Sequence, residues 1–586
     1  MKKYWNNIIA LILSFILIVF IWHKFLISGN SIIFILILIA LYYFMKKVIS
    51  EENKRKFIVS GIIGLLFATI YIICTSINVD YTLNNILNKW TIINFAGYTI
   101  LGWSLISSIF TILEKHNLKS SNIKIKNIEF LSVGKISFLI NMALIIIAWL
   151  PYFLRYYPGL LTADSCTQIS QAIGRATLSS HHPVFHTALI SIFVNLGRTM
   201  FNNINTGVAI YTIFQMIAMA MLFSIVLRYL AKKETPIFIR VIVLLYYMFY
   251  PVNALFSITM WKDILFAGIV PIFIIQCIEL VFSTEEFLSK KKNIIIFIAI
   301  AILTFLLRNN GIYVIILSLP FILIALRKYL KKISLMFVII IMTYVVVNNV
   351  LFSMLNIRKG SVGEMLSIPL QQIARVEKYH REELDQETIE QINNYFKCTN
   401  IGDKYNPIIS DPVKAELNTE YFDENKVEFI KLWLKLLKTY FKDYVESFIS
   451  NSYGYYYPEA THWVANRTME PNDMGLEQTP IIQTELIDFV IERREIPILS
   501  MCFSIGTAFW IVVICLGYKV YKKEYKNILI YLPIFILWLT LIASPVFCEY
   551  RYAYPIFTTL PIYIGLDFIK RKEILDGKNC SINTML

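Results

Sequence analysis

The chain has 586 residues, of which 57% are hydrophobic and 16% are charged, and its formal net charge is +15 at pH 7. An average soluble domain is about 25% charged, so this composition excludes a soluble globular enzyme. The 21 Gly and 18 Pro residues are too few for a disordered or collagen-like chain. Apolar runs of about 20 residues predict an all-α polytopic membrane protein instead.

The positive charge favours a membrane over a nucleic-acid partner. Lys and Arg residues gather in short loops between apolar runs, as the positive-inside rule predicts for cytoplasmic loops. The eight Cys residues are scattered without a CxxC pair, so we expect no metal site and no disulfide framework. The sequence contains no Walker-type loop and no GxGxxG motif, and we expect no cofactor.

Five apolar runs are expected to cross the membrane before the first long polar loop: 8–27, 31–45, 57–77, 92–113 and 136–153. The first run lacks a small-residue cleavage site and a second run follows directly, so it is interpreted as a retained helix with a cytoplasmic N-terminus. Five crossings then put the segment from Arg155 onward outside the cell membrane.

The next apolar run, 183–196, decides the rest of the topology. It is short for a crossing, and counting it as one would place Lys232 and Lys233 outside with every later basic cluster. A helix on the outer surface puts all of these clusters inside. The remaining crossings are then 208–230, 236–255, 264–282, 294–306, 312–326, 334–355, 496–518, 528–544 and 554–568. We therefore expect about 14 transmembrane helices, with both termini cytoplasmic.

Four units follow from this topology: an N-terminal transmembrane block (1–154), a core with the first external loop and the surface helix (155–355), an extracytoplasmic domain (356–495), and C-terminal transmembrane helices with a cytoplasmic tail (496–586). The third unit holds more than half of the acidic residues of the chain. Its helical patterns at 383–396 and 426–448 predict a mainly α-helical domain.

Polar residues suited to catalysis or ligand binding cluster at the outer face of the predicted membrane. In the first cluster, a helix that begins near Asp164 is expected to place Asp164, Gln168 and Gln171 on one face, at positions i, i+4 and i+7. A carboxylate held there suits a base that activates an acceptor hydroxyl. The alternative is that Asp164 only caps this helix, a role that Thr162 could also fill.

The second cluster is His181 and His182, followed by Pro183 at the first turn of the surface helix. A zinc site would need a third ligand, and none follows at the spacing that an HExxH motif provides. Hydrogen bonding to a sugar, to a phosphate or to the Asp164 segment is favoured over metal binding.

Three further pairs of polar residues lie at the outer ends of predicted spans: Lys262–Asp263, Arg308–Asn309 and Glu549–Arg551. The functional interpretation is that the cations bind a phosphate and that the neighbouring groups orient it or a substrate hydroxyl. The alternative is that these side chains anchor the helices at the interface, bind ordinary headgroups, or pair with one another. The aromatic residues from Tyr455 to Trp463 are suited to stacking on sugar rings, although no single Tyr stands out among 35.

The order of these motifs resembles the GT-C superfamily, the polytopic glycosyltransferases that use polyprenyl-phosphate-linked sugars. The likeness is to the branch of the protein O-mannosyltransferases and aminoarabinose transferases, and it rests on Tyr157-Pro158-Gly159, on Thr162-Ala163-Asp164, and on His181-His182-Pro183. The combination YPGxxTxDS, HHPxxHT, WKDxxFA and RNNGxY more closely resembles a family of uncharacterised bacterial polytopic membrane proteins placed near those transferases.

The resemblance implies a transferase that moves a sugar from an undecaprenyl-phosphate-linked donor to a glycan, glycolipid or protein acceptor on the outer face of the membrane. Asp164 would be the base, Lys262 and Arg308 would stabilise the phosphate, and Arg551 would be a weaker third cation. His181 and His182 would position the substrate. The chain departs from the well-known members in having five spans, not one, before the Asp loop, and in lacking a DxD or ExD motif there. The metal-independent members are the nearer comparison.

Two other classes remain open: a flippase or transporter of lipid-linked glycans, and a non-catalytic scaffold of envelope biogenesis. A transporter should carry charged residues deep in an internal cavity. A scaffold should tolerate the loss of Asp164, Lys262 and Arg308. Convergence of these residues with Arg551 around one outward-facing site would favour the transferase, and their dispersal would favour the scaffold.

Overall fold

The computed structural model describes residues 2–25, 32–119, 131–358, 360, 362–460, 467–469, 472–485, 487, 488, 496 and 499–569. Within these residues the secondary structure is helical, with isolated β-bridges and no strand. Ten of the described helices are long and apolar enough to cross a membrane, or eleven if one bent pair is a single span. The protein is therefore an all-α polytopic membrane protein.

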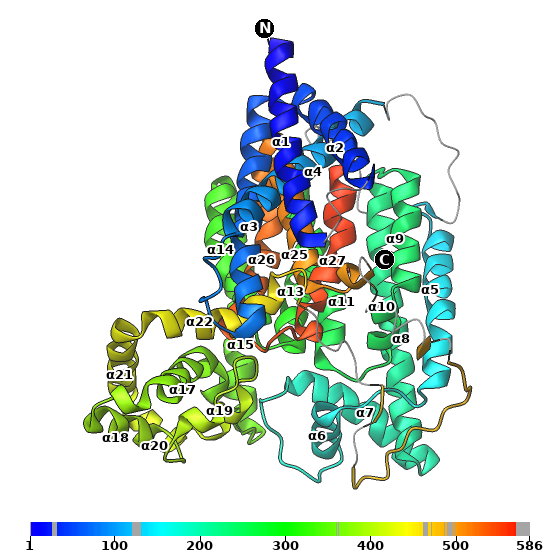
Figure 1. The fold of residues 1–586 in the computed structure, drawn as a ribbon. Coiled ribbons are helices and arrows are strands. Elements are labelled where there is room, and N and C mark those ends of the chain that lie inside the picture. Colours follow the sequence, from blue (N-terminus) through cyan, green and yellow to red (C-terminus); the bar gives the residue numbers. More distant parts are fainter. Residues whose placement is uncertain are drawn as a thin grey trace.

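The N-terminal block consists of α1 (Lys2–Phe25), α2 (Ile32–Ser50), α3 (Lys54–Asp80), α4 (Thr91–Lys119) and α5 (Lys135–Arg155). Asn53 caps α3 by accepting a hydrogen bond from the backbone N–H of Lys56, and Tyr81 ends this helix in the left-handed conformation. Helices α3 and α4 pack closely where Gly64 faces Gly102, since a Cβ on Gly64 would lie 2.6 Å from the backbone N of Trp103. The first four helices form one bundle at one side of the molecule (Figure 1).

The core is built from α8 (Ile204–Lys232), α9 (Ile237–Phe249), α10 (Pro251–Ser257), α11 (Lys262–Phe282), α12 (Thr284–Ser289), α13 (Lys291–Leu307), α14 (Gly311–Ala325), α15 (Leu330–Val345), α24 (Leu499–Cys502), α25 (Ile505–Tyr521), α26 (Ile528–Ala543) and α27 (Tyr550–Asp567). Helix α11 is the central element, because 94% of its most apolar window is buried among its neighbours. Helices α9 and α10 meet at a 51° bend, where Pro251 starts a new helix. The predicted spans overlap described helices, but 236–255 is divided between α9 and α10, and 496–518 between α24 and α25. Length and apolarity show ten or eleven candidate crossings among the described residues, and one of them is the helix Val184–Phe201, which was predicted to lie on the surface.

Two helices, α6 (Ala163–Ala172) and α7 (Val184–Phe201), cover one end of the bundle (Figure 1). Helix α7 is longer than the predicted run 183–196, and its length and composition would allow a crossing. Helix α7 packs against the N-terminal part of α8, where His186 meets Tyr211, Phe193 packs on Phe214, and Gly197 packs against Gly207.

A separate helical unit lies at the same end of the bundle, at the lower left of Figure 1. It contains α17 (Ser367–His380), α18 (Gln386–Tyr395), α19 (Asp411–Ala415), α20 (Thr419–Glu424), α21 (Lys426–Thr439) and α22 (Phe441–Ser452). These helices enclose their own hydrophobic core, which includes Leu370, Ile373 and Phe429. At its centre the buried guanidinium of Arg375 pairs with Asp443 and Glu446. The unit is held to the bundle by the loop between α3 and α4, whose Leu83 N–H donates to Glu446.

Candidate active site

The site is assembled where two loops from different parts of the chain run side by side. Leu160 and Thr259 form a β-bridge, with the N–H of Leu160 donating to Ile258 O at 2.9 Å. Trp261 Nε1 donates to Thr162 Oγ1 at 2.7 Å. This pairing brings the start of α6, which carries Asp164, next to the start of α11, which carries Lys262.

Gly159 is required for this close approach. Its φ of +140° is a backbone conformation that residues with a side chain rarely adopt, and a Cβ there would lie 2.4 Å from Thr212 Oγ1. The backbone of the 156–162 loop can pass over α8 only because this position has no side chain.

Asp164 is the centre of an ion-pair cluster. Its Oδ2 accepts a hydrogen bond from Arg551 Nη1 at 2.7 Å and lies 3.7 Å from Lys262 Nζ. Arg551 also pairs with Glu549, whose Oε1 is 3.3 Å from Arg551 Nε, and its guanidinium lies 5.0 Å from the ring centre of Trp261. The Asp164 side chain keeps 29% of its surface exposed, so it is partly accessible to solvent.

Thr162 and Ser165 cap α6, which bears on the alternative role of Asp164. Ser165 Oγ accepts a hydrogen bond from Thr162 N, and its own hydroxyl donates to Met260 O at 2.7 Å. The Asp164 carboxylate, in the first turn, is turned toward the cations. The capping role therefore falls to its neighbours.

Arg308 and Asp263 form a buried ion pair beside this cluster. Arg308 Nη1 is 2.8 Å from Asp263 Oδ1, and the two side chains are 8% and 0% exposed. The Arg308 guanidinium lies 4.4 Å from the ring centre of Tyr552, and Arg551 approaches the same ring at 4.9 Å. Tyr552 therefore links the two guanidinium groups.

Asn309 holds the turn that carries Arg308 against the loop before α7. Its Nδ2 donates to the carbonyl oxygen of Ser180 at 3.1 Å. Asn309 is therefore a support of the site and is not part of the ion-pair cluster.

His182 is joined to the cluster through Lys262. Its Nδ1 lies 2.9 Å from Lys262 Nζ and accepts a hydrogen bond from the ammonium group. Burial and the Lys262 charge lower the pKa of His182 to about 3, so this ring is neutral at pH 7. His181 packs edge-to-face on His182, with ring centres 4.6 Å apart, and faces solvent.

Gln168 lies outside the Asp164 cluster, although the helical spacing predicted a shared face. Its side chain is buried, with Nε2 donating to Thr187 Oγ1 at 2.9 Å and Oε1 lying 3.1 Å from His186 Nδ1. Gln171, the third residue of that predicted face, instead donates to Ser179 Oγ. The end of α6 is thus fixed to α7 by amide contacts.

A hydrogen-bonded chain behind the site was not predicted. It continues from His186 Nε2 to the Tyr211 hydroxyl at 2.7 Å, and from that hydroxyl to Gln215 Oε1 at 3.0 Å. Gln215 Nε2 then donates to the carbonyl oxygens of residues 256, 257 and 259, just before Lys262. The sequence signal for this hydrogen-bonded chain is Gln215, an amide inside an apolar run, because such a group needs hydrogen-bond partners within the protein.

The electrostatics of the cluster keep Asp164 ionised. Burial opposes the ionisation of Asp164, but the charges of Arg551 and Lys262 prevail and lower the pKa of Asp164 to about 2. Burial raises the pKa of Glu549. Five helices, α6, α7, α11, α14 and α27, begin beside these residues, and helix N-termini add positive potential.

The aromatic segment 453–457, which was predicted to stack on sugar rings, packs inside the protein. Tyr455 is fully buried, with its hydroxyl donating to Val546 O at 2.5 Å, and Trp538 Nε1 donates to its backbone carbonyl. Gly454 packs against Cys548, next to Glu549. The segment therefore packs behind the loop that precedes α27. Trp463 lies outside the described residues.

The geometry thus brings together side chains from five separate stretches: Asp164, His182, Lys262 with Asp263, Arg308, and Glu549 with Arg551. Trp261 and Tyr552 join them as ring partners of the guanidinium groups. Among the described residues, no group of three or more His, Cys, Asp or Glu side chains is placed to hold a metal ion.

The chain belongs to DUF6020, a family of unknown function, whose profile matches residues 172–576. The match includes His182, Lys262, Arg308 and Arg551, and it begins after Asp164. No curated protein and no solved structure matches the chain.

Proposed function

We propose that this protein is a membrane-embedded glycosyltransferase of the GT-C type, which moves a sugar from a polyprenyl phosphate, such as undecaprenyl phosphate, to an acceptor hydroxyl outside the cell membrane. One observation carries the proposal: the cations Lys262 and Arg551 contact a partly exposed carboxylate, Asp164, and Arg308 approaches the ring of Tyr552, as Arg551 does, at the beginnings of several helices. A lipid-linked phosphate and an acceptor hydroxyl need these groups together.

In the reaction, the bond from the anomeric carbon to the phosphate oxygen breaks and a bond to the acceptor oxygen forms. The acceptor proton passes to Asp164, and the lipid phosphate leaves with the electron pair. Lys262 and Arg308 stabilise the charge on this leaving group. Asp263 holds Arg308 in place, because the pair is buried and 2.8 Å apart.

The ion pairs of Asp164 suggest how the donor prepares the base. With a pKa of about 2, the carboxylate is a weak base while Arg551 and Lys262 hold it. A donor phosphate would compete for the same cations and so raise the basicity of Asp164. Donor binding would then activate the group that accepts the acceptor proton.

The topology of the proposal has about 14 crossings, both termini in the cytoplasm, and α7 lying on the outer surface. The Asp164 cluster and the unit from α17 to α22 then face the outside, where that unit would hold a glycan, glycolipid or protein acceptor. The division into units at 1–154, 155–355, 356–495 and 496–586 belongs to the same proposal. Membrane lipids surround the helices, and no cofactor is required.

The distribution of charge is the argument against a transporter. The cluster lies at the beginnings of helices at one end of the bundle, whereas substrate paths across a membrane need polar groups at mid-depth. A non-catalytic scaffold would keep its function after these ion pairs are removed. The two alternatives are outcomes of the experiment that follows.

The test incubates the purified protein with a panel of labelled undecaprenyl-phosphate sugars and an envelope extract as acceptor, and measures released lipid phosphate. Asp164→Asn should lower the rate by about 100-fold or more. Asp473→Asn is the matched control, since its side chain is 93% exposed and its ion pair among the described residues is with Arg175, and it should leave the rate unchanged. Equal rates for Asp164→Asn and the wild type, or no release from any donor, would overturn the proposal.

A further inference from the structure

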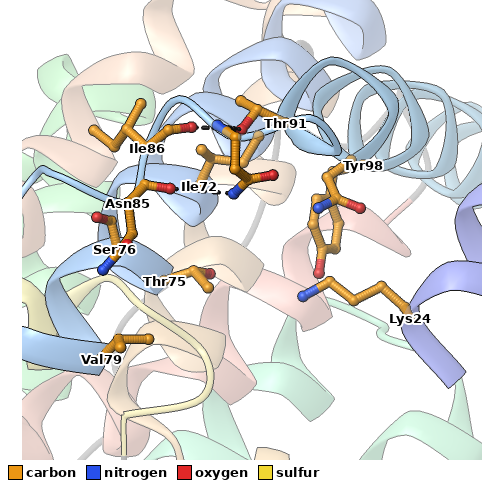
Figure 2. A pocket seen from close by; sticks show the side chains of 11 residues that line it. Lys24, Ile72, Thr75, Ser76, Val79, Asn85, Ile86, Thr91 and Tyr98 are labelled. Carbon is orange, nitrogen blue, oxygen red and sulfur yellow. Dashed lines mark hydrogen bonds between the residues drawn. The ribbon is translucent and has the colours of Figure 1, made fainter.

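A second site candidate is a cavity in the N-terminal block, outside the residues matched by the family profile. It has a volume of about 150 Å³ and lies between the ends of α1 and α3, the loop after α3, and the beginning of α4 (Figure 2). The lining residues are Lys24, Ile72, Thr75, Ser76, Val79, Asn85, Ile86, Asn88, Thr91, Asn94 and Tyr98. At about 30 Å³ per water molecule, it has room for a phosphate ester headgroup.

The lining has the character of a site for a polar anion. Lys24 is the one charged residue among the described side chains that line it, and its ammonium group lies 5.7 Å from the ring centre of Tyr98. Figure 2 shows Lys24 reaching from α1 toward Tyr98. The other polar groups are amides and hydroxyls, so the cation of Lys24 meets no carboxylate within the described lining.

Asn94 supplies an unused hydrogen-bonding group. Its Oδ1 is buried and has no hydrogen-bond partner among the described residues. Its neighbours Asn88 and Thr91 are already engaged, with Asn88 Nδ2 donating to Asn85 O and Thr91 Oγ1 donating to Ile86 O. A buried acceptor without a partner is unusual, and a ligand with a hydroxyl group would satisfy it.

The cavity lies at the same end of the molecule as the Asp164 cluster. The loop after α3 rests on α22, where Lys442 Nζ donates to Asn84 Oδ1 at 2.6 Å. The hydroxyls of Thr75, in the lining, and Tyr457 are 3.2 Å apart, and Gly454 contacts Cys548 beside Glu549. Segment 453–457 therefore separates the cavity from the cluster.

Apolar side chains around the cavity suit a lipid tail. Trp22 on α1, Leu87 in the loop and Ile92 on α4 are exposed large hydrophobic residues. Trp22 packs edge-to-face on Trp90, and two such rings near the end of a span are typical of the membrane interface. A ligand could therefore place an anionic headgroup on Lys24 and its chains along α1 and α4.

We propose that this cavity binds the headgroup of a phosphate ester lipid, with the phosphate on Lys24 and a headgroup hydroxyl or phosphate OH donating to Asn94 Oδ1. Two sources share this chemistry: a glycerophospholipid of the surrounding membrane, and a polyprenyl phosphate. The inference stands independently of the proposed transferase activity, because none of the lining residues belongs to the Asp164 cluster.

The test titrates the whole protein, in detergent, with dihexanoylphosphatidylglycerol and with farnesyl phosphate, and uses dihexanoylglycerol and farnesol as probes without phosphate. Native mass spectrometry gives the affinity and the number of molecules bound. Lys24→Gln should weaken binding of a phosphate probe by about tenfold, whereas Lys24→Arg should retain it. Lys89→Gln is the matched control, since Lys89 lies over Trp90 in the same loop and does not line the cavity.

The two phosphate probes distinguish the sources. Preference for farnesyl phosphate assigns the cavity to a polyprenyl lipid, and preference for the glycerophospholipid assigns it to a membrane lipid. Because the proposed donor site would also bind farnesyl phosphate, the titration is repeated with Lys262→Gln, whose effect should be independent of Lys24→Gln. Unchanged affinity for both phosphate probes in Lys24→Gln, or equal binding of probes without phosphate, would refute the inference while leaving the transferase proposal intact.

Discussion

Asp164 and Arg551 lie 387 positions apart in the chain, and their side chains form a hydrogen-bonded ion pair of 2.7 Å at the beginnings of α6 and α27. Lys262 approaches the same carboxylate from α11. The shared carboxylate makes the three side chains one electrostatic unit, so changing one member should alter the pKa of another. This coupling provides the first test of the site.

Arg551→Gln should raise the pKa of Asp164 from about 2 toward its usual value of 3.8, because the Arg551 charge is the largest influence that lowers it. The acid limb of the activity profile should then move to higher pH, with the rate at pH 7 reduced by roughly 10-fold to 100-fold. The profile of lipid phosphate release between pH 3 and 8 measures this shift. Arg155→Gln, which breaks a different Arg–Asp pair with Asp488, is the control and should leave the limb in place.

His182 should make stability depend on pH. Its pKa is about 3 in the folded protein and 6.5 ordinarily, so the unfolded chain binds a proton in this window that the folded chain does not. Stability should therefore fall as pH decreases from 6.5 to 3, and His182→Gln should remove this part of the slope. Thermal unfolding in detergent at several pH values measures it, with the exposed His181→Gln as control. Identical slopes in all three proteins would exclude this contribution.

The contribution of Asp164 to stability should also depend on pH, but in a lower pH range than that of His182. Its folded-state pKa of about 2 lies below the ordinary 3.8, so its ion pairs stabilise the protein above pH 3.8 and are lost as pH falls toward 2. Asp164→Asn should therefore flatten the stability profile only below about pH 4, which separates its effect from that of His182.

Asp263→Asn should destabilise the protein by about 3–5 kcal/mol, because it leaves the buried guanidinium of Arg308 without its counter-charge. Adding Arg308→Gln should recover part of this loss, since the double variant buries no unpaired charge. Chemical unfolding of the single and double variants measures the coupling. Glu286→Gln provides the comparison, because its pair with Lys290 is about one-third exposed and should contribute less than about 1 kcal/mol.

Gly159→Ala should disrupt the approach of the 156–162 loop to α8. The new Cβ would meet Thr212 Oγ1 at 2.4 Å, in a backbone conformation unfavourable for a side chain. We expect loss of activity and a stability decrease of roughly 1–3 kcal/mol. Gly174→Ala is the matched control: its φ is also positive, but no atom lies within 4 Å of the added Cβ. Equal activity and stability of the two variants would show that the contact with Thr212 does not determine the effect of Gly159→Ala.

The helices of this protein could be predicted from its sequence because helix formation depends on local patterns. Apolar runs such as that of α11 mark a buried helix wherever they occur, and the basic loops order them across a membrane. The surface position of α7 rests on the same charge pattern and stays a prediction, because the length and apolarity of this helix also allow a crossing. The residue types of the Asp164 cluster were also visible, since charges are rare in so apolar a chain.

The partnerships of those residues were decided by helix packing, which joins positions far apart in the chain. The spacing of Gln168 predicted that it shares a helix face with Asp164. In the structure α7 packs against α6, and the Gln168 amide contacts Thr187 and His186 of α7. Tyr455 was predicted to stack on a sugar ring, but its side chain is buried behind Glu549. Hydrophobicity and periodicity describe a segment and its solvent, whereas ion pairs and cavities depend on which segments meet, and that is settled only when the helix surfaces pack together.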